Sequence, residues 1–394
     1  MRKYSFFEEL LISGTIKNHC RSIDIGQHLR IIPISSGSST TAEAEVACSY
    51  WDIPDYMKVT FHGDNGKVFE RSVALYEGSY IELGKYQGFN HFIKQKLSSN
   101  RRAKIRAAKR NLEHIFSIDY AYYYGVELSD STYFGLMKAL KEMITKRFEE
   151  KQMKHTALED WDNFIKWGRI LIAEKRAVMF VIYSDGQPIH IAFNYVWEKL
   201  VFAFVRGFHV NYSRFHLGFI DMLIQIEWSF NNQFQIHDFL RGNLDYKIMF
   251  ADSTYLYRAH FIIPSVKRNP LALLPWIGCS LKFDVYYNLK RKFGILYHGI
   301  SFLPKRRKKK VSVYQLDVPS QEESIQLAKN HMPKVNLETE PHEYLKRAAY
   351  HFLYNTKTPI KELEVYGIPG QQDIYFFKGN GQVKKVQFTN SKKN

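Results

Sequence analysis

Polar side chains cluster at one point of an otherwise apolar stretch, where a carboxylate, a phenol and two cations follow one another closely. The run reads His237-Asp238-Phe239-Leu240-Arg241-Gly242-Asn243-Leu244-Asp245-Tyr246-Lys247. Such groups can move protons and hold an anion, and strand ends in α/β proteins are where ligands bind. The run therefore predicts a site. The residues alone leave an alternative open, in which Asp238 caps the turn and Tyr246 packs in the core.

A second candidate lies before it, at a predicted junction of strand, loop and helix over residues 205–219. Tyr212, Ser213, Arg214 and Gly218 precede or enter a helix that is predicted from His216 to about Phe230. The start of a helix leaves backbone N–H groups free and carries a positive partial charge, so it favours phosphate. Arg214 would add a charged donor, and Gly218 would let the anion approach the backbone. A purely structural helix entry has the same composition.

The elements that must position these residues read as an α/β (α+β) core. Three strand-like runs, 178–183, 189–197 and 200–205, follow in succession with an Asp185-Gly186 turn, and the helix precedes two further strands at 233–239 and 254–263. We expect one mixed, mainly antiparallel sheet flanked by helices. His190 and Asn194 are an even number of residues apart, so they share a face. They either line a pocket or are satisfied core residues.

Three helices are predicted before these strands. The first is capped by Ser98 or Ser99 and carries a helical stripe of apolar residues between Ile105 and Ile115. Its other face is a ridge of cations. Asp130-Ser131 caps a second helix, and 158–175 reads as a third.

The two candidate sites together resemble a known pattern. Tyr-Ser-Arg-Phe-His-Leu-Gly at 212–218, Asp-Phe-Leu-Arg-Gly at 238–242, Tyr246-Lys247 and the basic helix at 101–112 are similar to the BioF-like (CelD-type) acetyltransferase family. That family belongs to the GNAT superfamily and is related to the Fem-type transferases. The resemblance spans about residues 98–263 and implies a GNAT-type sheet.

The resemblance implies an N-acyltransferase that moves an acyl group from acetyl-CoA or another acyl-CoA to an amine. The acceptor would be an amino-sugar or a lipid-linked precursor in envelope or polysaccharide biosynthesis. The residues expected to act are Asp238 as base and Tyr246 as acid, Tyr212, Ser213, Arg214 and Gly218 on the cofactor, and Arg241, Lys247, His190 and Asn194 on the acceptor. No metal site is expected, because no two histidines stand at i, i+4 with an acid between them.

Composition divides the chain into four predicted parts. Residues 1–95 are expected to form an N-terminal mixed α/β lobe with strands at 57–62 and 68–76 on either side of an Asp64-Asn65-Gly66 turn, and 96–265 the acyltransferase core. Residues 266–310 would be a basic amphipathic segment and linker, and 311–394 a small C-terminal α/β domain of unknown role.

The net charge of +17 is concentrated in three patches, at 101–110, 267–293 and 305–310. Focal patches predict specific anionic partners: cofactor phosphates, lipid headgroups or nucleic acid. Segment 267–310, with Trp276, Phe283 and Tyr287, is expected to dock on anionic membrane; the alternative is packing on the core. No apolar run approaches the ~20 residues of a membrane span, and the N-terminus lacks a signal-peptide core. A cytoplasmic protein is expected, peripheral at most at the inner face of the membrane.

Two other functional classes remain open from the sequence. A Fem-like transferase using aminoacyl-tRNA would explain the basic helix at 101–112, which could follow a phosphate backbone. A non-catalytic anion- or membrane-binding protein would explain the charge alone. Because no recognised nucleic-acid-binding motif is present, a nucleic-acid partner is not expected.

Overall fold

The computed structural model describes most of the chain. The described residues are 2–14, 16, 20–26, 29–33, 48–61, 68–152, 158–159, 161–242, 244–264, 274–292, 314–328, 332–339, 341–371 and 373–388.

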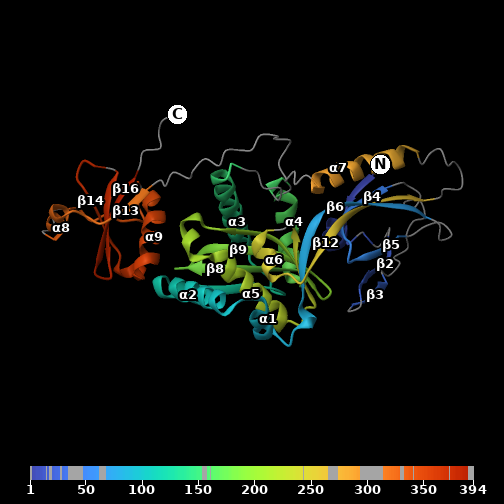
Figure 1. The fold of residues 1–394 in the computed structure, drawn as a ribbon, viewed down its shortest axis with the longest axis horizontal. Coiled ribbons are helices and arrows are strands. Elements are labelled where there is room, and N and C mark those ends of the chain that lie inside the picture. The colour runs from blue at the N-terminus through green and yellow to red at the C-terminus, as the bar shows by residue number, and fades with distance from the viewer. Residues whose placement is uncertain are drawn as a thin grey trace.

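A nine-stranded sheet runs through the middle of the molecule (Figure 1), in the order β1-β4-β12-β6-β11-β10-β9-β8-β7. Its strands are β1 (Arg2–Ser5), β4 (Cys48–Pro54), β12 (Ser253–Pro264), β6 (Val68–Glu82), β11 (Ile236–Arg241), β10 (Leu200–Phe208), β9 (Gln187–Trp197), β8 (Ala177–Ser184) and β7 (Ile118–Tyr123). Only the pairs β1–β4 and β10–β11 are parallel among these described strands. The predicted mixed, mainly antiparallel sheet flanked by helices is confirmed.

Helices cover both faces of this sheet. On one face α1 (Phe89–Lys96), α2 (Ser99–Ile115) and α5 (Leu217–Asn231) bury apolar residues of β8 to β11, and on the other α3 (Asp130–Glu150) and α4 (Trp161–Ala173) do so. Ser98 caps α2 as predicted, since its side chain accepts a hydrogen bond from the Arg101 N–H. The cap of α3 is Ser129 rather than the predicted Asp130-Ser131. The short helix α6 (Asp245–Phe250) follows β11.

Strands from the first 95 residues are divided between two sheets, and three of them, β1, β4 and β6, belong to the nine-stranded sheet. β6 inserts between β11 and β12, and β4 pairs with β12 on the far side. The strands predicted around residues 64–66 both exist, yet β5 (Lys58–Phe61) pairs with β2 (Cys20–Ile25) in a second sheet, β3-β2-β5, that also contains β3 (Leu29–Pro33). The turn signal at residues 64–66 therefore predicted the wrong strand pairing. The ladders with β11 and β12 together pair more of β6 than a hairpin with the four-residue β5 could.

The C-terminal residues build a third sheet in the order β13-β16-β15-β14. Its strands are β13 (Tyr314–Asp317), β16 (Gln382–Phe388), β15 (Ile374–Gly379) and β14 (Glu364–Gly367), accompanied by α8 (Gln321–Ala328) and α9 (Lys346–Thr356). α9 packs against α2 and the 3₁₀ helix η8 (Val210–Phe215), and residues of all three belong to one apolar cluster. Of the predicted basic amphipathic segment and linker at 266–310, the described residues include 274–292 alone, and the rest lies outside them.

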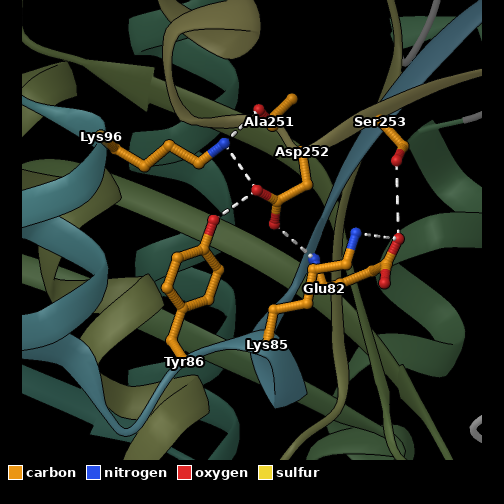
Figure 2. Close-up of polar contacts among 7 residues, drawn as sticks. All are labelled: Glu82, Lys85, Tyr86, Lys96, Ala251, Asp252 and Ser253. Atoms are coloured by element: carbon orange, nitrogen blue, oxygen red, sulfur yellow. Dashed lines mark hydrogen bonds and ion pairs between the residues drawn. The ribbon is translucent and has the colours of Figure 1, made fainter.

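A partly buried ion pair fastens the start of β12 to α1 and to the end of β6 (Figure 2). Lys96 Nζ lies 2.6 Å from Asp252 Oδ1 and donates to the Ala251 carbonyl at 2.7 Å. The Tyr86 hydroxyl also donates to Asp252 Oδ1, and the Glu82 N–H donates to Oδ2 at 2.9 Å. Both carboxylate oxygens are therefore paired. We call these five residues the Asp252 junction.

Candidate active site

The two parallel strands in the middle of the sheet part after three residues. β10 and β11 are in register from Leu200–Ile236 to Phe202–Asp238 and no further. β10 continues to Phe208 paired with β9 alone, while β11 continues along β6. The far half of β10 thus faces β11 without a ladder, beside the helix α5 that begins at Leu217. An edge of this kind can accept an extended ligand by adding it as a strand.

A bulge in β10 decides which side chain points into this region. The register against β9 shifts between Phe202 and Val205, and both of these side chains pack on the α3 and α4 side. The bulge restores Arg206 to the α5 side, since bulges re-aim the side chains that follow them. There Arg206 Nη1 lies 3.7 Å from Asp221 Oδ2, with its side chain still 17% exposed.

Beneath α5 lies a buried polar cluster, which we call the α5 cluster. Its members are Arg206 together with His190 and Asn194 of β9, Asp221, Gln225 and Ser229 of α5, and His237 of β11. Asn194 Nδ2 donates to Gln225 Oε1 at 2.8 Å, and Gln225 Nε2 donates to Asp221 Oδ2 at 2.7 Å. Ser229 Oγ lies 3.0 Å from His237 Nδ1. The shared face predicted for His190 and Asn194 is the face toward α5.

Several buried atoms of the α5 cluster have no hydrogen bond to any described residue. These atoms are both ring nitrogens of His190, Asp221 Oδ1 and His237 Nε2. His190 Nε2 approaches Asp221 Oδ2 to 3.5 Å only. Leaving a buried polar atom unpaired costs about 1–3 kcal/mol, so such atoms in a native protein call for a partner such as water or a ligand.

Burial sets the charge of the two imidazoles. Desolvation lowers the pKa of His190, and the pKa of His237 falls to about 3, with nearby Arg206 adding to the effect in both cases. Both rings are therefore neutral at neutral pH, and a neutral imidazole keeps one nitrogen that can accept a proton. Beside the Asp221 carboxylate, His190 is a general-base candidate.

Cations and a phenol surround Arg206. Arg147 of α3 stacks its guanidinium 4.3 Å from the ring centre of Phe208, and burial followed by the Arg206 charge lowers the pKa of Arg147. The ring of Tyr246 lies 5.8 Å from the Arg206 guanidinium and 6.4 Å from the ring of Phe219, in the first turn of α5. Tyr246, predicted as the acid, therefore lies near the start of α5. The surroundings favour a ligand with negative charge.

Asp238 does not face this opening. Its neighbour His237 points to α5, so Asp238 points to the opposite side of β11, where it is fully buried. The Tyr56 hydroxyl donates to Oδ2 at 2.6 Å, Tyr255 donates to both oxygens at 2.8 Å, and the Leu240 N–H donates to Oδ1 at 2.7 Å. Burial raises the pKa of Asp238 to about 6 despite these donors. The predicted role of Asp238 as the base is therefore corrected: this carboxylate ties β11 to β12 and to Tyr56.

The predicted acceptor residues are not gathered in one place. Lys247 donates to the Phe239 and Arg241 carbonyls at 2.6 and 2.8 Å, which fastens α6 to the end of β11. Burial, followed by the charge of Arg206, lowers the pKa of Lys247 to about 7. Arg241 instead stacks on Tyr76 at 3.7 Å, and its charge acts on Tyr287 of α7 (Leu274–Lys292). His190 and Asn194 therefore lie apart from Arg241.

The predicted cofactor loop lies where α9 meets the core. Tyr212 is buried, with its ring 4.8 Å from Tyr350 of α9. Ser213 and Arg214 are exposed, and the Arg214 charge reaches His351 of α9. α5 begins after His216, which has a left-handed backbone and makes no side-chain cap. A Cβ added at Gly218 would meet no atom within 4 Å, so the helix start is open to an anion.

A cavity of about 600 Å³ adjoins this loop. α3 supplies Glu142 and Lys146, the β8–β9 turn supplies Asp185, and the C-terminal part supplies Lys346 and Tyr350, while His209 and Tyr212 come from the loop. The C-terminal residues thus complete one wall of this cavity. Within the described residues no group of three His, Cys, Asp or Glu side chains could hold a metal ion.

The sequence did not single out Arg206, Asp221 or Gln225. Asp221, Gln225 and Ser229 recur every four residues in the strongly apolar segment 217–231, and that helical stripe was the available signal. No sequence signal identified Arg206, because in a strand without the bulge its side chain would point away from α5.

Comparison with known proteins places the site within a family segment. Residues 99–248 match the model of the acetyltransferase (GNAT) domain. This segment contains β7 to β11, α5 and the whole α5 cluster. The protein therefore carries a GNAT-type acetyltransferase domain and is an acyltransferase, whereas the finer BioF-like or Fem-like assignment stays a prediction. No curated protein is similar enough to match the chain.

Solved structures show partial likeness only. The chain is 11% identical to the C-terminal domain of a putative lysylphosphatidylglycerol synthetase from Agrobacterium fabrum, with 59% of this chain and 72% of that one covered at a TM-score of 0.36. A conserved protein of unknown function from Bacteroides thetaiotaomicron is 8% identical, with 60% and 80% covered at a TM-score of 0.38. A tandem GNAT protein from the clavulanic acid pathway is 6% identical, with 59% and 73% covered at 0.31. The class rests on the family model.

Proposed function

We propose that this protein transfers an acyl group from an acyl-CoA thioester to the amine of a sugar or lipid-linked precursor of envelope or extracellular polysaccharide. The observation that carries the donor site is the parting of β10 and β11 inside the acetyltransferase segment, beside the open start of α5. The free edge of β10 suits the amides of an extended coenzyme A arm. The choice of acceptor rests on the sequence resemblance. Acyl-CoA would be met in the cytoplasm.

The diphosphate of the donor would lie at the start of α5. The start of α5 carries the positive end of the helix dipole, which favours phosphate. Gly218 leaves room for the anion, and exposed Arg214 can swing onto a phosphate. Tyr212 would act from beneath by fixing the loop against Phe116 and Tyr350.

The α5 cluster would serve the transfer itself. The amine nitrogen attacks the thioester carbonyl and the C–S bond breaks. The amine proton passes to neutral His190, which Asp221 holds and stabilises once charged, while the Tyr246 hydroxyl gives a proton to the departing thiolate and is reprotonated from solvent. Arg206, at the exposed edge of the cluster, would stabilise charge that develops on the carbonyl oxygen. Asp238 has no step in this scheme.

Titration calorimetry with acetyl-CoA tests the donor site. Arg214→Ala should weaken acetyl-CoA binding by roughly 1.5–3 kcal/mol, the range for a charge-assisted contact. Arg21→Ala, an exposed arginine on the separate sheet that contains β2, is the matched control and should bind as the wild type does. Unchanged affinity in Arg214→Ala would remove that residue from the site, and no heat with any acyl-CoA would remove the donor class.

One observation favours a second class of donor, an aminoacyl-tRNA. α2 exposes Arg101, Lys104, Arg106, Lys109 and Arg110 along its surface, and such a ridge can follow the phosphates of an aminoacyl-tRNA. Filter binding with tRNA decides between the two donors. Retention that survives excess coenzyme A and falls when Arg106 and Arg110 become Glu would favour the tRNA donor.

A further inference from the structure

Helix α7 lies along the outside of the large sheet, over β6 and β12 (Figure 1), and is apolar on two opposite faces. Its inner face packs on the sheet. Phe283 lies 4.9 Å from the ring centre of Trp51, and Trp276 and Tyr287 join the same cluster. The aromatic residues predicted to dock on a membrane are therefore used to hold the helix, because they bury against the sheet.

The outer face of α7 carries a different set of apolar residues. Leu274, Leu281, Val285 and Leu289 are 60%, 45%, 57% and 48% exposed. Their spacing of seven, four and four residues places them in one stripe along the helix. Four large aliphatic side chains in a continuous exposed stripe mark an interaction surface.

The charge beside this stripe identifies the partner. α7 carries Lys282, Lys290, Arg291 and Lys292 against the single acid Asp284, whose carboxylate accepts a hydrogen bond from Asn288 at 3.0 Å. Lys282 and Lys292 are exposed next to the stripe. Two copies of this face would bring like charges together, whereas anionic lipid headgroups complement it and acyl chains accept the leucines.

We propose that the outer face of α7 docks the protein on anionic membrane, with Leu274, Leu281, Val285 and Leu289 inserted among the lipids and Lys282 and Lys292 at the headgroups. The basic runs at 267–268 and 305–310 lie outside the described residues and carry no part of this inference. It stands independently of the proposed transfer reaction, because α7 lies outside the acetyltransferase segment.

Vesicle sedimentation of the full chain tests the proposal, with phosphatidylcholine vesicles that contain or lack phosphatidylglycerol. The wild type should sediment with the anionic vesicles only, and less at high salt. Leu281→Ser with Val285→Ser should lower the partition coefficient by about tenfold or more, since the inserted hydrocarbon is lost. The variant Val318→Ser with Ile325→Ser changes two exposed aliphatic residues of the C-terminal part. It is the matched control and should bind normally.

Lys282→Glu with Lys292→Glu separates charge from insertion and should remove the salt-sensitive part. Circular dichroism melting should be unchanged in all of these variants, because each altered side chain is exposed. Equal binding to neutral vesicles, or wild-type binding by both α7 variants, would overturn the proposal. So would a dimer in lipid-free sedimentation equilibrium that the Leu281→Ser, Val285→Ser variant dissociates, because the face would then join two copies of the chain.

Discussion

Two polar clusters of the molecule differ in how completely they are paired: the Asp252 junction, at the ends of α1 and β6, and the α5 cluster beneath α5. In the Asp252 junction both carboxylate oxygens have donors, and Lys96 has two acceptors (Figure 2). In the α5 cluster Asp221 Oδ1 and both nitrogens of His190 have no hydrogen bond to a described residue. A fully paired network stabilises and specifies a fold, whereas a partly paired one keeps capacity for something else. We therefore propose a structural role for the first cluster and a chemical role for the second.

The largest expected effect is on the stability of the Asp252 junction. Asp252→Ala should lower the free energy of unfolding by about 3 kcal/mol, because Lys96 loses its carboxylate partner while two other donors, the Tyr86 hydroxyl and the Glu82 N–H, are also left unpaired. Urea unfolding measures this. Lys85→Ala, which removes a mostly exposed pair with Glu82, should cost less than about 1 kcal/mol. Equal losses in the two variants would mean that the junction is no more than a surface contact.

The α5 cluster should respond in the opposite way. Asp221→Asn should reduce turnover about 100-fold, the range for a positioned acid–base group. The free energy of unfolding should change by less than about 1.5 kcal/mol, since the amide still accepts from Gln225. Thiol release from acetyl-CoA under saturating acceptor reports turnover. A variant that unfolds readily but keeps its turnover per folded molecule would reverse the assignment of the two clusters.

Asp238 tests whether complete pairing predicts a structural role. Asp238→Asn should cost about 2 kcal/mol at neutral pH, because one of the tyrosine donors loses its carboxylate oxygen, with turnover per folded molecule nearly unchanged. The pKa of about 6 lies above the ordinary 3.8. The stabilisation from the protonated form is thus present below pH 3.8 and lost as the pH rises through about 6. The stability difference between wild type and variant should follow that window, and a flat difference would contradict it.

The smallest effect concerns Lys247, whose charge interacts with Arg206 on the α5 side of the sheet and with Asp238 on the opposite side. Its folded pKa of about 7 is below the ordinary 10.5, so its contribution to stability is present above pH 10.5 and is lost as the pH falls through about 7. The unfolding free energy of the wild type relative to Lys247→Met should rise by about 1 kcal/mol from pH 7 to pH 8. Urea titrations at the two pH values measure it. A constant difference would place the ammonium in contact with solvent.

Much of the central domain could be predicted from local patterns. The runs at 178–183, 189–197 and 200–205 form β8, β9 and β10, and Ser98 caps α2. Apolar alternation and helix capping depend on residues a few positions apart, so both can be recognised in the sequence without knowledge of the fold. The shared face of His190 and Asn194 follows from the same period, and the structure adds that α5 covers it.

The partners of the candidate residues could not be predicted. Asp238 is paired by Tyr56, which stands 182 residues earlier in the chain, and β6 enters between two strands that the sequence places in succession. Contacts over such separations leave no periodic signal. Taken by itself, the segment around Asp238 contains several ionisable residues, and these suggested a catalytic role. In the folded chain Asp238 instead accepts hydrogen bonds from Tyr56 and Tyr255.

The sequence by itself determined the class of the domain, the polar run at 237–247, and the order of strands and helices around residues 177–263 except for the short helix α6. Only the tertiary structure decided which of those polar groups remain unpaired. The bulge after Phe202 turned Arg206 toward Asp221, and the insertion of β6 brought Tyr56 and Tyr255 within reach of Asp238. The physical reason is that propensity and periodicity are local properties, whereas the pairing of a buried charge depends on whichever strands and helices enclose it.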